Sequence, residues 1–414
     1  MSVTKSNPIT KQMVWEAYKK VKANKGSAGV DRVSLEEYEI KLEDNLYKLW
    51  NRLSSGSYFP LPVKEVEIPK GEGKTRKLGI PTVGDRIAQM VIKMYIEPRL
   101  EAVFHDSSYG YRPGRNQHMA IERAKVNCWK YDWVIDLDIK GFFDEIDHEN
   151  LNKALDRHCE EKWVRMYITR WLECPIQKRS GELVKRDKGT PQGGVISPLL
   201  ANVYLHYSLD KWMETKYSQV PFERFADDII IHCKSEEEAV EVLERIRERL
   251  SDCKLELHPD KTRIVYCRDG KRKRPKERPV QFTFLGFDFK SRRSKNRHDG
   301  SIFYSFTPAI SKKREQMLTV KLRKLNISRR TRASIEELAE ELNPKVSGWI
   351  NYYGKFRRSA MRKICTRVNE RLVKWIWWKH KKFKRSWKQA WKYLHDIQQH
   401  NLKLFTHWKY GFTY

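Results

Sequence analysis

The stretch Phe225-Ala226-Asp227-Asp228-Ile229-Ile230-Ile231 places two adjacent carboxylates between an aromatic-led segment and an apolar, β-branched run. β-Branched residues favour strands and aspartate is common in turns, so the pattern predicts a hairpin with both acids at its bend. Neighbouring carboxylates repel each other unless a cation neutralises them, and Mg²⁺ prefers carboxylate oxygens combined with substrate phosphates. An ordinary solvated turn is the alternative, so the metal interpretation depends on a third carboxylate elsewhere.

A third carboxylate comes from the run Trp133-Val134-Ile135-Asp136-Leu137-Asp138-Ile139, in which apolar and acidic residues alternate. Alternation with a period of two predicts a strand that turns Asp136 and Asp138 to one face. Acids beside valine and isoleucine are costly to bury unless they bind something. With the two acids of the hairpin, Asp138 would complete a ligand set for two metal ions, one activating a hydroxyl and one stabilising a leaving group.

A glycine-rich stretch, Gly189-Thr190-Pro191-Gln192-Gly193-Gly194-Val195-Ile196-Ser197-Pro198-Leu199-Leu200-Ala201-Asn202, lies between these two acidic segments. Its glycines and Pro191 predict a tight turn, and Ser197 as N-cap followed by Pro198 predicts the start of a helix. An ordinary junction between a loop and a helix would have the same features. The position of Gln192 between acidic strands favours a surface that senses a base pair.

The order of these segments resembles the successive palm motifs of reverse transcriptases, in particular those encoded by bacterial group II introns. The palm motifs are matched by Asp138-Ile139-Lys140-Gly141-Phe142-Phe143-Asp144, Pro191-Gln192-Gly193-Gly194 and Phe225-Ala226-Asp227-Asp228. Gly26–Asp31 resembles the N-terminal extension motif, and Gly348–Tyr353 resembles the maturase-type thumb. The first fingers motif is resembled by Ile68–Lys70 with Arg76–Pro81 and Asp85–Arg86, and the second by Tyr109–Arg115. The two motifs that close the palm are resembled by Leu257–Thr262 and Phe284–Phe287. The resemblance covers nearly the whole chain. It departs at Phe225, where many members carry tyrosine.

The resemblance implies an α+β protein with the right-hand polymerase architecture of fingers, palm and thumb, the thumb being basic and α-helical. We expect an N-terminal extension over residues 1–55, fingers and palm over 56–290, and a thumb or maturase-specific domain over 291–414. The local patterns agree, because they predict helices over about Lys11 to Leu53 and Ser235 to Leu250, strands over about Val63 to Leu78, and an exposed loop over Arg268 to Pro279.

The resemblance also assigns metal ligands. Asp138, Asp227 and Asp228 are expected to bind two Mg²⁺ ions, for which Mn²⁺ can substitute, with the carbonyl oxygen of Ile139 as a further ligand. Lys261 is expected to protonate the leaving pyrophosphate as a general acid, with a structural role as the alternative. Asp136 and Asp144 are expected to be supporting acids and not metal ligands.

A second set of residues is expected to bind the incoming nucleotide. Lys70, Arg76 and Lys77 would meet its triphosphate, although each could instead be a surface charge. Gln192 would lie near the templating base pair. Phe143, five residues after Asp138, matches the ring that excludes a ribose 2′-hydroxyl in this family, with core packing as the alternative.

The composition favours a polyanionic partner, because 83 lysines and arginines against 53 acids give a formal net charge of +30 over 414 residues. We expect nucleic-acid contacts from Arg112, Arg115 and a C-terminal region in which Lys379, Lys381, Lys382 and Lys384 alternate with tryptophans. The tryptophans could instead form the core of a helical bundle. They are Trp375, Trp377, Trp378, Trp387, Trp391 and Trp408.

Other classes of protein are disfavoured. The chain shows no apolar run that could span a bilayer and no signal peptide at Met1 to Tyr18, so we expect a bacterial cytoplasmic, nucleoid-associated protein without a membrane partner. Its seven cysteines are scattered, which favours reduced thiols. No paired cysteines and histidines follow Cys365, which favours a member of the family that lacks an endonuclease.

The sequence therefore predicts an RNA-directed DNA polymerase that uses an RNA template, a DNA primer and dNTPs, and that also binds a group II intron RNA to assist its splicing and mobility. Two alternatives stay open. A domesticated relative in DNA repair, phage defence or CRISPR adaptation would keep the metal ligands and lack an intron. A splicing maturase without significant polymerase activity would not need those ligands.

Overall fold

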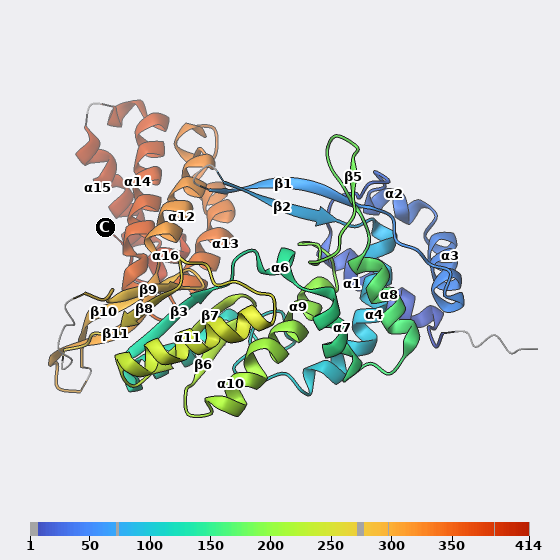
Figure 1. The fold of residues 1–414 in the computed structure, drawn as a ribbon. Helices are drawn as coiled ribbons and strands as arrows, with labels where there is room; N and C mark the ends of the chain where they lie inside the picture. Colours follow the sequence, from blue (N-terminus) through green and yellow to red (C-terminus); the bar gives the residue numbers. More distant parts are fainter. Residues whose placement is uncertain (1–6, 72–73, 271–276, 297, 385, 414) are drawn as a thin grey trace, which may run out of the picture. The chain divides into compact units, whose positions relative to one another are not determined.

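The computed structural model describes residues 7–71, 74–270, 277–296, 298–384 and 386–413. They form two compact units, one of Met1–Ala124 with Ile135–Ile264 and one of Lys125–Val134 with Val265–Tyr414 (Figure 1). The boundary near residue 264 precedes residue 291, at which the sequence predicts the start of the thumb. The predicted loop over Arg268 to Pro279 includes residues 271–276, which lie outside the described part of the chain.

The N-terminal part of the first unit is helical, as predicted. It contains α1 (Lys11–Asn24), α2 (Leu35–Ile40), α3 (Leu42–Ser55) and, after two strands, α4 (Val83–Glu101). Side chains of Thr10, Ser34 and Thr82 accept hydrogen bonds from backbone N–H groups in the first turns of α1, α2 and α4, so each of these helices begins at a polar cap. α1 and α3 pack against each other and against α4.

The predicted strands over Val63 to Leu78 form an antiparallel pair, β1 (Val63–Gly71) and β2 (Lys74–Ile80), in which Lys64 lies opposite Ile80. Two short strands, β4 (Ile176–Gln177) and β5 (Leu183–Val184), extend this pair to a sheet with the order β2-β1-β4-β5. The sheet joins segments that are about a hundred residues apart in the chain, which a purely local pattern does not reveal.

A second sheet carries both acidic segments. Its order is β6-β7-β3-β8, formed by β6 (Phe222–Phe225), β7 (Asp228–Cys233), β3 (Trp133–Asp138) and β8 (Arg263–Tyr266). α11 (Glu236–Asp252) packs against β7 through the predicted apolar stripe of Ala239, Val242, Leu243, Ile246 and Leu250. The Ser235 side chain caps this helix, but the Glu238 carboxylate accepts from the N–H of Lys234 instead of Ser235, so the capping box is only half formed.

The remaining helices of the first unit are α5 (Gln117–Lys130), α6 (Phe142–Glu145), α7 (His148–Asp156), α8 (Lys162–Leu172), α9 (Ser197–Leu205), the π-helix η1 (His206–Asp210) and α10 (Lys211–Lys216). α5 continues into the second unit. The prediction that Ser197 caps α9 is wrong by one residue, because Ile196 holds the N-cap position. Ser197 is the first residue of the helix, and its hydroxyl oxygen accepts a hydrogen bond from the Thr190 hydroxyl at 2.8 Å.

The second unit combines a three-stranded antiparallel sheet with helices, and with the first unit it confirms the predicted α+β class. The sheet has the order β11-β10-β9, formed by β9 (Gln281–Phe284), β10 (Phe287–Lys295) and β11 (Ile302–Ile310). The helices are α12 (Lys312–Lys324), η2 (Ile327–Arg329), α13 (Ile335–Tyr353), η3 (Arg358–Met361), α14 (Arg362–Lys379), η4 (Lys381–Phe383), α15 (Trp387–His400) and α16 (Thr406–Lys409).

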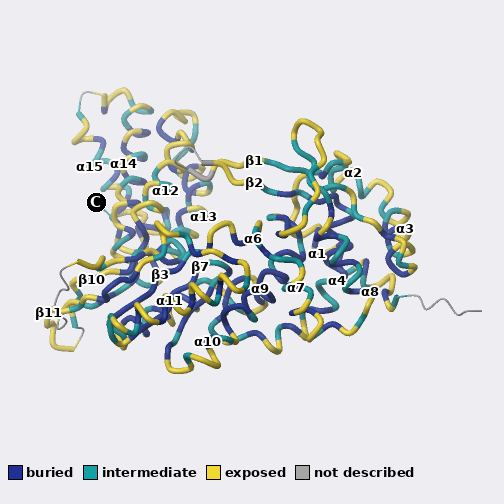
Figure 2. Tube along the Cα trace, in the orientation of Figure 1, coloured by how far each residue is buried: buried dark blue, intermediate teal, exposed yellow. Residues whose placement is uncertain are grey.

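Some tryptophans of these helices lie in the helical core and others are exposed, so each of the two interpretations of the tryptophans, core or surface, fits part of the set. Trp375 and Trp408 are buried in the helical core, whereas Trp378 and Trp387 are each 46% exposed. Buried and exposed positions alternate along these helices in Figure 2. In the described part of the chain, no helix combines the length and the apolar character needed to cross a lipid bilayer.

Candidate active site

The predicted hairpin of the acidic pair is confirmed. β6 and β7 are antiparallel with Phe225 opposite Asp228, so Ala226 and Asp227 form a two-residue turn. Ala226 has a φ of 57°, in the left-handed region that tight hairpins require and that non-glycine residues seldom adopt. Asp227 is therefore held at the tip of the turn and Asp228 at the first position of β7.

Residues to which the sequence assigned no individual role hold this turn in place. A Cβ atom on Gly110 would lie 2.5 Å from the backbone nitrogen of Ala226, so only glycine fits there. The Gly110 carbonyl oxygen accepts from Asn202 Nδ2 at 2.7 Å, and Asn202 Oδ1 accepts from the Arg224 guanidinium at 2.9 Å. Arg224 also pairs with Asp210 at 2.5 Å, and neither of these two side chains is exposed to solvent.

This buried network is electrically balanced. Burial alone would raise the pKa of Asp210, but the positive charge of Arg224 and hydrogen bonds from His206 and Arg224 outweigh it and lower that pKa. A charged pair, Glu223-Arg224, inside a short strand between Phe222 and Phe225 is the sequence signal that could have revealed the network, because such charges are rarely buried without partners.

The third predicted carboxylate, Asp138, lies at the end of β3, the strand next to β7 in the sheet. Its backbone oxygen accepts a hydrogen bond from the N–H of His258 at 2.8 Å, and its carboxylate accepts from Lys261 Nζ at 2.7 Å. The carboxylate of Asp136 instead pairs with Arg263 Nε at 3.1 Å. These contacts support a structural role for Asp136 and leave Asp138 as the acid that faces Lys261.

The charges of these acids meet at Asp228. Although Asp228 is exposed at the start of β7, partial desolvation of its carboxyl group and repulsion from the negative charges of Asp227, Asp138 and Asp136 raise its pKa to about 7 despite the opposing charge of Lys261. A cation placed here would relieve the repulsion. The donors are carboxylate oxygens, which are the ligands that Mg²⁺ prefers, so the chemistry of the residues fits the predicted metal.

The side chains are not arranged as a ready-made metal site. Across the described residues, no three acidic, histidine or cysteine side chains are grouped so that they could hold a metal ion as they stand. Lys261 places its ammonium group against Asp138, where it serves as the counter-charge. Ile139, the predicted carbonyl ligand, is buried and pairs with Leu257 in an isolated antiparallel bridge.

Two of the residues predicted near the nucleotide, Arg76 and Gln192, lie together with the predicted supporting acid Asp144. Arg76 Nε donates to Gln192 Oε1 at 2.7 Å, and Gln192 Nε2 lies 3.4 Å from Asp144 Oδ2. Lys77 instead pairs with Glu65 at 3.3 Å, and the side chain of Lys70, in β1, lies outside the described part. Arg76, in β2, is thus linked through the Gln192 side chain to Asp144, in α6.

The glycine-rich turn that carries Gln192 is docked against β2. A Cβ atom on Gly193, whose φ is 126°, would lie 2.5 Å from the carbonyl oxygen of Gly79. The N–H of Gly79 donates to the Gln192 carbonyl oxygen at 2.9 Å. The predicted tight, Cβ-poor approach is therefore present, and it fixes the position of the Gln192 side chain relative to Arg76.

Phe143 satisfies the packing interpretation, since its side chain is only 7% exposed and its ring packs edge-on against Phe142 at 5.5 Å between ring centroids. Its carbonyl oxygen accepts from the N–H of Thr190 at 2.8 Å, which ties it to the stretch that contains Gln192. A ring fixed in this way is able to act as a steric barrier, so packing and sugar selection are compatible at this position.

Two of the residues predicted to bind nucleic acid are used inside the protein. The Arg112 side chain is 4% exposed, pairs with Glu101 at 2.6 Å and donates to two backbone carbonyl groups, so its guanidinium is used inside the protein. Lys379 Nζ donates to the carbonyl oxygen of Ala333 at 2.5 Å. Arg115 pairs with Asp106 at 2.7 Å. Lys381, Lys382 and Lys384 are exposed, as a binding surface requires.

Comparisons with known proteins agree with the geometry. The family profile described as reverse transcriptase (RNA-dependent DNA polymerase) matches residues 68–289, and that of the group II intron, maturase-specific domain matches residues 316–394. The chain is 34% identical to protein YkfC of Escherichia coli K12 over 305 residues, which cover 64% of this chain and 77% of YkfC. A solved structure of apo telomerase from Candida tropicalis aligns with a TM-score of 0.44 and 14% identity, covering 58% of this chain and 54% of that one.

A further relative is the group II intron-encoded protein LtrA of Lactococcus lactis subsp. cremoris. It is 35% identical over 198 residues, which cover 48% of this chain. The same alignment covers 33% of LtrA, so the similarity concerns about a third of that protein.

Proposed function

Because this chain belongs to the reverse transcriptase (RNA-dependent DNA polymerase) family and carries a group II intron maturase-specific domain, we propose that Asp138, Asp227 and Asp228 carry out its polymerase reaction. The protein is an RNA-directed DNA polymerase with the right-hand fold of that family. The observation that supports the site is the convergence of these three carboxylates, where desolvation and then mutual repulsion raise the pKa of Asp228 to about 7. Primer extension by acid-to-amide variants tests the assignment.

In the proposed mechanism, the three aspartates would hold two Mg²⁺ ions. When bound, these ions would activate the 3′-hydroxyl of the primer and neutralise charge on the leaving pyrophosphate. Asp227 and Asp228 are fixed by the strained turn, and Asp138 is fixed by the hydrogen bond from His258 to its carbonyl oxygen. Lys261, whose ammonium group lies 2.7 Å from the Asp138 carboxylate, is the candidate general acid that would donate a proton to the pyrophosphate.

The nucleotide is proposed to enter beside Arg76, Lys77 and Gln192. The Arg76 guanidinium is exposed and is hydrogen-bonded to Gln192, a neutral side chain, so it can exchange that partner for a phosphate and bind it bidentately. Gln192 would then turn toward the templating base pair. Lys77 would exchange Glu65 for phosphate in the same way, as a point charge.

Sugar selection is proposed for Phe143. A Phe143→Val variant should raise the use of ribonucleotides relative to deoxyribonucleotides by roughly tenfold or more, the scale on which a pocket discriminates against one small group. Single-nucleotide incorporation with dNTP and rNTP pairs measures this ratio. Phe142→Val is the matched control, because Phe142 is also buried and packs against Phe143. An active Phe143 variant with an unchanged ratio would assign this ring to the core alone.

The second unit is proposed to bind a group II intron RNA and assist its splicing and mobility. Support comes from the match of residues 316–394 to the maturase-specific domain and from the exposed lysines after α14. Changing Lys381, Lys382 and Lys384 to glutamine should weaken RNA binding. It should also reduce the slope of log affinity against log salt by about 0.7–0.9 for each phosphate that the variant no longer neutralises. Arginine at the same three positions keeps the charge and should keep the slope.

Splicing separates this proposal from its alternative. An Asp227→Asn variant should still promote splicing of RNA transcribed from the flanking locus at low Mg²⁺, because the RNA performs that chemistry, whereas the glutamine variant should not. If the wild-type protein stimulates no splicing, a domesticated reverse transcriptase in repair, phage defence or CRISPR adaptation becomes the better proposal. If the wild-type protein stimulates splicing but does not extend a primer, a maturase without polymerase activity becomes the better proposal.

A further inference from the structure

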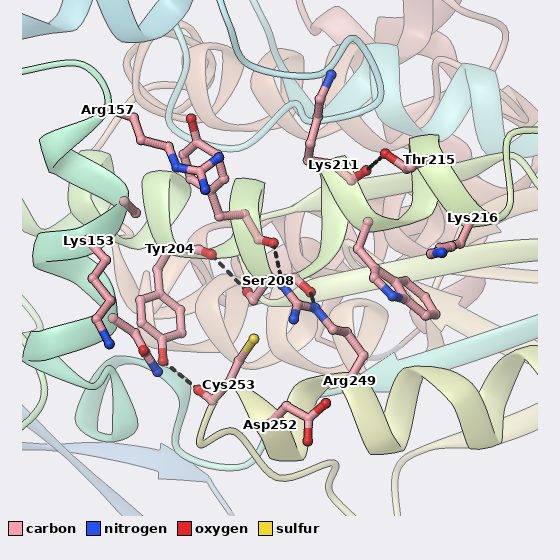
Figure 3. A pocket seen from close by; sticks show the side chains of 14 residues that line it. Lys153, Arg157, Tyr204, Ser208, Lys211, Thr215, Lys216, Arg249, Asp252 and Cys253 are labelled. Atoms are coloured by element: carbon pink, nitrogen blue, oxygen red, sulfur yellow. Dashed lines mark hydrogen bonds between the residues drawn. The ribbon is translucent and has the colours of Figure 1, made fainter.

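A cavity of about 490 Å³ in the first unit has no part in the proposed reaction. It is bounded by α7, by the continuous helix α9–η1–α10 and by the end of α11 (Figure 3). None of the residues that line it belongs to the set that the sequence predicts for metal, nucleotide or nucleic acid. Its volume lies within the range of about 300–1,000 Å³ that is typical of small-molecule sites.

The wall of the cavity is strongly basic. Five cationic residues and a single acid, Asp252, contribute to it; the cations are Lys153, Arg157, Lys211, Lys216 and Arg249. In Figure 3, Lys153 and Arg157 approach from one side and Lys216 from the other. Arg157 and Lys216 are exposed and form no ion pair with any residue that the structure describes. The surplus of positive charge favours an anionic ligand.

The π-helix η1 builds the floor of the cavity. A π-turn displaces backbone carbonyl groups from the regular helical hydrogen-bond pattern, and such turns are frequent at functional sites. Here the carbonyl oxygens of Tyr207 and Ser208 accept hydrogen bonds from Arg249 at 3.0 Å and 3.2 Å. Arg249 is thereby fixed in the floor without a carboxylate partner among the described residues, so its positive charge adds to that of the rim.

Aromatic residues also line the cavity. Trp212 is half-buried in the wall, and Tyr204 anchors the opposite end by donating its hydroxyl hydrogen to the carbonyl oxygen of Cys253. Aromatic rings beside arginine and lysine side chains are the combination that binds nucleotides, since the base stacks on a ring and the phosphate meets the cations. Inorganic phosphate alone would use only the cations.

We propose that this cavity binds a nucleotide unit, with its base against Trp212 and its phosphate between Arg157, Lys216 and Arg249. Two ligands with the same chemistry could supply this nucleotide: a free nucleotide, or one nucleotide of a single strand that passes over this face. The proposal does not depend on the polymerase assignment, because the two sites share no residue.

Cys253 provides a local readout, because it lines the cavity and is partly exposed whereas the other six cysteines are buried. Burial raises the pKa of the Cys253 thiol, so alkylation by N-ethylmaleimide is followed at mildly alkaline pH, with mass spectrometry to identify the modified residue. The probes are uridine 5′-monophosphate, a short oligouridylate, uridine and inorganic phosphate. At a concentration ten times its Kd, a bound probe should slow alkylation about tenfold.

Protection by the monophosphate supports a free nucleotide, and protection by the oligouridylate alone supports a strand. The Arg157→Ala/Lys216→Ala double variant should lose that protection. The Lys234→Ala/Arg245→Ala double variant removes the same charge from exposed positions outside the cavity and should keep it. The proposal would be overturned if inorganic phosphate protected Cys253 as well as the nucleotide does. It would also be overturned if no probe protected Cys253, or if both double variants lost protection equally.

Discussion

An Asp227→Asn variant should extend a primer on an RNA template at least about a hundredfold more slowly than the wild-type protein. Groups that only support metal ligands already contribute about 10- to 100-fold, and a ligand itself contributes more. Asp138→Asn should have the same effect, because Asp138 ends β3 and Asp227 lies in the turn before β7, the strand next to β3 in the sheet. The measurement is dNTP incorporation with Mg²⁺, beside RNA affinity, which should be unchanged because no packing group is removed.

Asp136→Asn is the matched control. Asp136 lies on β3 like Asp138 and undergoes the same change from acid to amide, but it is paired with Arg263. It should keep most of its extension activity. Near wild-type extension by Asp227→Asn or Asp138→Asn would contradict the assignment, and an equal loss in Asp136→Asn would show that any lost charge in this sheet disturbs activity.

Asp228 supplies a stability readout for the same site. Its folded-state pKa of about 7 lies above the ordinary value of 3.8, so between these values the native protein holds more protons here than the unfolded chain. Stability must therefore fall as pH rises through this window. In metal-free buffer, Asp228→Asn should raise Tm at about pH 8 and raise it less at about pH 5, while it abolishes extension. A Tm of the Asp228→Asn variant below that of the wild-type protein at about pH 8 would contradict a raised pKa at Asp228.

The hairpin, the strand that carries Asp138 and the stripe of α11 were predictable because each is a local pattern. A period of two, a bend with two acids, and apolar residues three and four apart all lie within a few residues of one another. The order of the motifs then identified the family. Local patterns of this kind identify the acids and the element that carries each.

Contacts that tertiary packing creates between different elements could not be predicted in the same way. Lys261 meets Asp138 across more than a hundred residues, and Arg112 is buried against Glu101 although its motif suggested an exposed cation. Lys379 likewise donates to a backbone oxygen of another segment. In each case the residue type was interpreted correctly as a cation, and tertiary packing decided whether its charge meets solvent, a carboxylate or a carbonyl group.

The pair of Arg224 and Asp210 should have the largest effect on stability. Both side chains are fully buried, so Asp210→Asn or Arg224→Met leaves one buried charge without its partner and should lower the free energy of unfolding by about 3–5 kcal/mol. Urea denaturation measures this loss. The double variant Asp210→Leu/Arg224→Met removes both charges and should recover much of the stability, because apolar pairs of similar volume can replace buried ion pairs.

Activity distinguishes a merely stabilising pair from one that positions the catalytic turn. Arg224 holds Asn202, which holds the carbonyl oxygen of Gly110, and Gly110 lies directly against the backbone of Ala226. The double variant breaks this chain even when it restores stability, so its primer extension should stay impaired. Asn202→Ala should also reduce extension, with the Arg224–Asp210 pair intact. Full activity in a restored double variant would show that the turn keeps Asp227 and Asp228 in place without the network, and that Arg224 serves the fold alone.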